Sequence, residues 1–105
     1  MSNPTIQLLK RFLDKDPHDS FTRFALAMEY KKAGQLDLAE ITYLELISND
    51  PKYVGTYYHL GMIYTLSDNK EKARKVFEDG IQIATLANDS HAASELRQAL
   101  MELDF

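Results

Sequence analysis

The 105-residue sequence contains no cysteine. This absence excludes a disulfide framework, thiolate chemistry and a cysteine-based zinc site, and it fits a reducing compartment. The first residues also lack the basic stretch and the apolar stretch of a secretory signal peptide. We therefore expect a cytoplasmic protein.

Long hydrophobic runs and an excess of positive charge are missing as well. The longest run without a charged residue, with histidine counted as neutral, covers 53–67. It is shorter than the roughly 20 residues that cross a bilayer, so we interpret it as a buried helix and expect no membrane partner. The net charge of −4 gives no basic surface for nucleic acid. A composition of 45% hydrophobic and 27% charged residues is typical of a globular chain, and we expect one domain over 1–105.

No arrangement of residues that carries catalysis is evident in the sequence. The three histidines, His18, His59 and His91, are far apart and form no pair at a metal-binding spacing. The four glycines are scattered and form no phosphate-binding loop. We therefore expect no enzymatic activity, no metal and no cofactor.

The clearest feature that the sequence does contain is an internal repeat with an offset of 34 residues. Small residues fall on small residues, and aromatic residues fall on aromatic residues. The matched pairs are Leu26 with Leu60, Ala27 with Gly61, Met28 with Met62, Tyr30 with Tyr64, Ala39 with Ala73 and Tyr43 with Phe77. A fixed period of 20–50 residues is typical of repeat arrays.

Capping and turn residues divide each repeat into two helices. In the first repeat, Asp19 or Ser20 is a suitable N-cap and Gly34 a suitable stop for the first helix. Gln35 or Asp37 opens the second helix, and the turn-rich segment 48–51 ends it. The expected helices cover 20–33, 37–48, 53–66 and 70–84.

Segments at both ends also have helical patterns. Apolar residues recur at helical spacing over 4–16, and Pro4 suits a first helical turn. A last helix is expected to about Glu102. In that helix Glu95 and Gln98 stand where a third repeat would need a small residue and an aromatic one. We therefore expect an N-terminal helix over 3–16 and a C-terminal capping helix over 88–103.

This pattern resembles the tetratricopeptide repeat family, with one repeat over 20–53 and a second over 54–87. The resemblance implies an all-α fold, a right-handed α-solenoid of two helix–turn–helix repeats with a flanking helix at each end, about six helices in all. Asp68 stands where the family often has glycine. Gly80 stands where it often has alanine and is expected to weaken its helix by up to about 1 kcal/mol.

The resemblance also implies a function, binding another protein through the concave face of the repeats. The inward-facing positions hold Phe21, Phe24, Met28, Lys31 and Lys32 in the first repeat and Gly55, Tyr58, Met62, Thr65 and Leu66 in the second. All of them except Gly55 and Leu66 are our candidate protein-binding residues. This face is apolar and aromatic with lysines at one end, and we expect it to bind an extended peptide or an amphipathic helix.

Two alternatives to an open binding face remain. The N-terminal helix could cover Phe21 and Phe24, and the C-terminal helix could cover Tyr58 or Met62, which would make these side chains part of the core. The face could instead be buried in a homodimer, because two repeats are fewer than the roughly three that a stable stack usually needs. The protein would then be a self-assembling scaffold.

Overall fold

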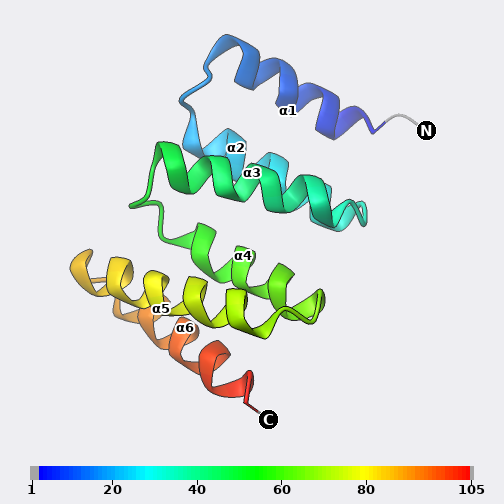
Figure 1. Ribbon diagram of the computed structural model, residues 1–105. Helices are drawn as coiled ribbons and strands as arrows, with labels where there is room; N and C mark the ends of the chain where they lie inside the picture. The colour runs from blue at the N-terminus through cyan, green and yellow to red at the C-terminus, as the bar shows by residue number, and fades with distance from the viewer. Residues whose placement is uncertain (1–2, 105) are drawn as a thin grey trace. The chain divides into compact units, whose positions relative to one another are not determined.

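The computed structural model describes residues 3–104, and these form six α-helices and no strand (Figure 1). The helices are α1 (Pro4–Lys15), α2 (Ser20–Lys32), α3 (Leu36–Asn49), α4 (Gly55–Leu66), α5 (Lys70–Leu86) and α6 (Ser90–Glu102). The all-α prediction is confirmed. Each helix begins and ends within about two residues of its expected bounds.

Side-chain caps explain where most of the helices begin. Asn3, Asp19, Asn69 and Asp89 each accept a hydrogen bond from a backbone N–H in the first turn of the helix that follows. Asp19 also accepts a 2.7 Å hydrogen bond from the hydroxyl of Thr22. This bond and the one from the Thr22 amide lower the pKa of the Asp19 carboxyl.

Three helices end in the same left-handed turn. Gly34 after α2, Asp68 after α4 and Asn88 after α5 have φ values of 78°, 58° and 56°. In each case the amide of the following residue donates to a carbonyl five positions earlier, at 2.8–2.9 Å. This is the Schellman arrangement, which satisfies carbonyls at the end of a helix. Asp68 therefore adopts the conformation for which glycine is best suited.

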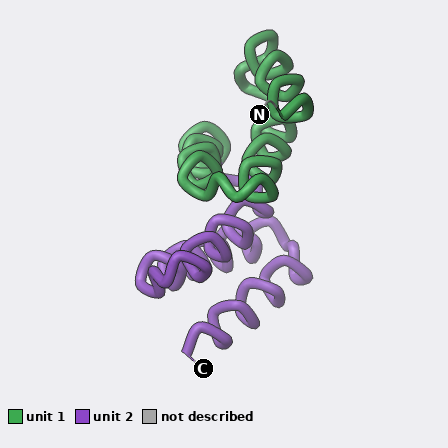
Figure 2. The backbone as a smooth tube through the Cα atoms, turned by 90° about the vertical axis from the view of Figure 1, so that its right-hand side faces the viewer, with its two compact units in different colours: residues 1–50 green, residues 51–105 purple. Residues whose placement is uncertain are grey.

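The chain divides into two compact units, the first ending at Asp50 and the second beginning at Pro51 (Figure 2). The first unit holds α1, α2 and α3, and α2 packs against both of the others. Ala27 and Tyr43, two of the residues that match across the 34-residue offset, are fully buried there. Burial raises the pKa of Tyr43, and Phe24 packs edge-on against its ring at a centroid distance of 6.0 Å.

In the second unit two glycines allow the helices to approach closely. A Cβ atom at Gly61 of α4 would overlap the ring of the fully buried Phe77 of α5. A Cβ atom at Gly80 of α5 would lie 2.5 Å from the Cβ of Tyr57 in α4. From the sequence, Gly80 was expected only to weaken its helix, whereas in the structure it allows this tertiary contact.

The last helix is held chiefly by α5. Ala93 and Leu96 of α6 are buried, and α6 packs more extensively against α5 than against α4. Just beyond α6, Asp104 accepts a 2.7 Å hydrogen bond from Arg74 of α5. This hydrogen bond and the positive charge of Arg74 lower the pKa of the Asp104 carboxyl. The arrangement leaves one face of α6 directed toward α4.

Candidate functional site

The candidate residues of the first unit are mostly accessible. Phe21 is 70% exposed and Met28 is 41% exposed, and Lys32 is exposed as well. Phe24 and Lys31 are half-buried. Phe21 is therefore not a core residue covered by the N-terminal helix. Phe24 packs in part against Tyr43.

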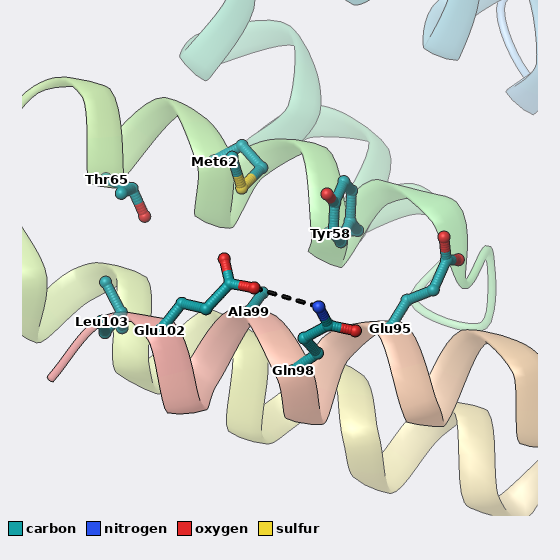
Figure 3. Close-up of a pocket in the computed structure, with 8 residues that line it drawn as sticks. All are labelled: Tyr58, Met62, Thr65, Glu95, Gln98, Ala99, Glu102 and Leu103. Carbon is teal, nitrogen blue, oxygen red and sulfur yellow. Dashed lines mark hydrogen bonds between the residues drawn. The ribbon is translucent and has the colours of Figure 1, made fainter. Parts of the chain in front are cut away.

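The candidate residues of the second unit line a cavity between α4 and α6 (Figure 3). Its volume is about 300 Å³. Tyr58 and Met62 are half-buried on the α4 wall, and Thr65 is exposed at its end. The remaining lining residues are Glu95, Gln98, Ala99, Glu102 and Leu103.

A second cavity, of about 290 Å³, extends this space toward the beginning of both helices. It shares Tyr58 and Glu95 with the first cavity and is also lined by Val54, Gly55, His59, Ala92 and Leu96. We call the two cavities together the α4/α6 groove. The C-terminal helix forms the opposite wall of the groove and leaves Tyr58 and Met62 half-buried.

Neighbouring groups hold the α4 wall in place. The ring centroid of Tyr58 lies 6.5 Å from that of Phe77 and 5.5 Å from that of His59. The hydroxyl of Thr65 donates to the carbonyl of Gly61 at 2.9 Å. This wall is thus aromatic and apolar, and the hydroxyl of Thr65 is already hydrogen-bonded within α4.

The α6 wall is acidic, which the sequence analysis did not predict. Glu102 is oriented from α6 toward α4, and its Oε1 accepts a 3.1 Å hydrogen bond from Gln98 (Figure 3). Glu95 Oε1 lies 3.6 Å from Nε2 of His91, which forms an ion pair only when the imidazole is protonated. None of the described residues that line the groove is a lysine or an arginine. In the sequence, Glu95 and Gln98 stand out only as departures from the repeat. The signal that could have indicated the acidic wall is the seven-residue spacing of Glu95 and Glu102 on one helical face.

The structure of residues 3–104 also bears on metal binding and on membrane insertion. No group of three or more histidine, aspartate or glutamate side chains in that range is placed to hold a metal ion. No helix within it is long and apolar enough to cross a membrane.

Comparison with known proteins agrees with the repeat pattern. The model of the tetratricopeptide repeat matches residues 22–53 and 54–85, more than half of the chain. A TPR repeat-containing protein of Pseudomonas aeruginosa is 28% identical over 99 residues, which cover 94% of each chain.

Two solved structures are also similar. The crystal structure of a tetratricopeptide repeat domain protein from Salinibacter ruber is 38% identical, covers 82% of this chain and 97% of its own, and has a TM-score of 0.78. A Bordetella parapertussis protein, solved in solution, is 25% identical, covers 99% of this chain and 90% of its own, and has a TM-score of 0.83. The chain belongs to the tetratricopeptide repeat family, whose members are generally non-enzymatic protein–protein interaction modules.

Proposed function

We propose that this protein binds a segment of a partner protein, a peptide or a helix, in the α4/α6 groove. The observation that carries the proposal is that Tyr58, Met62 and Thr65, all inward-facing positions of the second repeat, line one open groove. Aromatic and methionine side chains in such a groove offer a large apolar contact area, and methionine adapts its shape to the partner. Cavities of about 300 Å³ each accept side chains of a bound segment.

The first repeat adds a second contact region in this proposal. Phe21 and Met28 expose apolar surface, and Lys31 and Lys32 follow them on the same helix. Phe24 contributes the part of its ring that does not pack on Tyr43. We place this binding in the cytoplasm, since a chain without cysteine suits a reducing compartment.

Replacement of one residue in each region tests the proposal. Met62→Glu and Phe21→Glu are expected to weaken capture of the partner from the native cell by at least about 30-fold, which corresponds to about 2 kcal/mol. Leu86→Glu is the matched control, because Leu86 is 82% exposed and is absent from the groove lining. Partner capture is quantified by mass spectrometry, and helical content by circular dichroism.

Two results would count against the proposal. Loss of helical content in both Met62→Glu and Phe21→Glu would show that these two side chains are needed for the fold. Equal loss of partner with Leu86→Glu would show that capture depends on general surface character and not on the groove.

A second candidate function, self-assembly as a scaffold, is favoured by a different surface. Leu38, Ile41 and Leu44 of α3 are 42%, 54% and 45% exposed, and their spacing places them along one side of the helix. A second copy of the chain would bury this surface in a homodimer. The oligomeric state distinguishes the two candidates.

A further inference from the structure

We infer that the segment bound in the α4/α6 groove is cationic, with one lysine or arginine on each side of an apolar residue. This inference rests on the proposed function. The groove has two unlike walls. Its α4 wall offers Tyr58 and Met62, and its α6 wall offers Glu95 and Glu102. A partner that matches both walls needs apolar surface and positive charge together.

The negative charge of the α6 wall is not neutralised by cations that line the groove. Helix α4 contains no aspartate, glutamate, lysine or arginine, and the described lining residues include no lysine or arginine. Three cations of α5 have partners elsewhere in the second unit. These are Arg74 with Asp104, Lys75 with Asp79 at 2.6 Å, and Lys72 over the ring of Tyr64 at 5.6 Å. On α6 itself, His91 lies beside Glu95, and Arg97 lines a neighbouring cavity together with Glu102. Among residues 3–104, neither groove carboxylate forms an ion pair with a lysine or an arginine, so both can pair with an incoming cation.

The spacing of the carboxylates sets the spacing of the cations. Glu95 and Glu102 are seven residues apart on one helix, which is two helical turns and about 10 Å along the axis. In an extended segment, side chains two positions apart point to the same side and lie about 7 Å apart, and the length and flexibility of lysine and arginine side chains let both reach the two carboxylates. The apolar residue between them then points to the opposite side, toward Met62 on the α4 wall.

Both carboxylates are positioned to meet a partner from solvent. The Glu95 side chain is 54% exposed, and Glu102 is exposed and oriented by its hydrogen bond from Gln98 (Figure 3). A positioned carboxylate loses less conformational freedom when it pairs with a lysine or an arginine. An acidic segment would meet two like charges in the same place and is disfavoured.

Selection from a library of random twelve-residue peptides on the immobilised full chain tests the inference. We expect enriched peptides to carry two lysine or arginine residues around an apolar one. Affinity for a labelled enriched peptide, measured by fluorescence anisotropy, is expected to fall about 3-fold to 10-fold with Glu95→Gln or with Glu102→Gln, and further with both. Raising the salt concentration should weaken binding in the same direction.

The matched control is Glu78→Gln, which removes one negative charge from an exposed position of α5 outside the groove lining. Affinity should change less than 2-fold in this variant. The cationic inference is overturned if the enriched peptides are acidic or uncharged. It is also overturned if Glu95→Gln and Glu102→Gln both leave their affinity unchanged. The groove would remain a binding site in either case. If Met62→Glu abolishes the binding of none of the selected peptides, the proposed function is overturned, and this inference with it.

Discussion

Asp68 adopts a backbone conformation that favours glycine. Its φ of 58° lies in the left-handed region, which disfavours residues with a Cβ atom. We expect Asp68→Gly to raise the free energy of unfolding by about 0.5–1 kcal/mol, a few degrees in Tm for a domain of this size. Urea titration followed by circular dichroism measures the change.

The opposite substitution at the equivalent turn is the matched control. Gly34 has a φ of 78°, and a Cβ atom added there would meet nothing within 4 Å. Gly34→Ala should therefore lower the free energy of unfolding by about 1 kcal/mol through backbone conformation alone. If Asp68→Gly destabilised the protein, Asp68 would have a favourable interaction that outweighs its conformational cost.

The N-cap at Asp19 gives a stability contribution that depends on pH. Hydrogen bonds from the Thr22 hydroxyl and amide lower the folded-state pKa of this carboxyl. A lowered pKa stabilises the folded protein at a pH above the unfolded-state value of about 3.9, and this contribution is lost as the pH falls through the folded-state pKa. We expect Asp19→Ala to lower Tm by a few degrees at pH 7 and by progressively less below about pH 4.

Asp19→Asn is the control for this titration, because its amide oxygen caps the helix and does not titrate. The Tm of this variant should lie between those of Asp19→Ala and the wild type at pH 7, and its difference from the wild type should shrink below about pH 4. The same Tm deficit for Asp19→Ala at pH 7 and pH 2.5 would contradict the role given to the carboxylate.

At the scale of helices, the close approach of α4 and α5 depends on Gly61. A methyl group there would overlap the Phe77 ring, which is fully buried. Gly61→Ala should cost about 1–3 kcal/mol from overpacking, although alanine itself favours the helix. The free energy of unfolding from urea titration tests this.

A double-mutant cycle with Phe77→Leu isolates the contact. Because leucine is smaller than the ring, Gly61→Ala should be less destabilising in the Phe77→Leu background. Strict additivity of the two substitutions would mean that the cost arises elsewhere than at this contact.

The helices themselves were largely predictable from the sequence, because their determinants are local. Caps such as Asp19 and the stop at Gly34 act within one turn, and the 34-residue offset repeats the pattern. The contact of Gly80 with Tyr57 was not predictable, since it joins residues on two helices. When the residues that pack against a helical glycine are unknown, only its conformational cost to the helix can be predicted.

The candidate site was predictable on one wall only. Tyr58, Met62 and Thr65 follow from their positions in the repeat, which fix the face of α4 that they occupy. Glu95 and Glu102 belong to a helix that departs from the repeat, so the pattern did not assign them a role. Their place in the groove depends on how α6 packs on α5 and faces α4.

At the scale of the whole molecule, exposed apolar surface and net charge act in opposite directions. The α3 surface of Leu38, Ile41 and Leu44 favours association, and the net charge of −4 opposes it only weakly in physiological salt. Protein–protein interfaces of standard size bury about 800 Å² on each partner, more than three half-exposed side chains on one helix supply. We therefore expect a monomer of 12.0 kDa.

Light scattering after size exclusion, over a concentration series that reaches high micromolar values, measures this mass directly. Ile41→Lys is the informative variant, because Ile41 is the most exposed of the three. In a monomer this surface substitution should change the free energy of unfolding by no more than about 0.5 kcal/mol. If the wild type has twice the monomer mass and Ile41→Lys has the monomer mass, the α3 surface is the interface between copies. That result would favour the scaffold. A monomer with unchanged stability would count against the scaffold and favour the proposed binding of a partner segment.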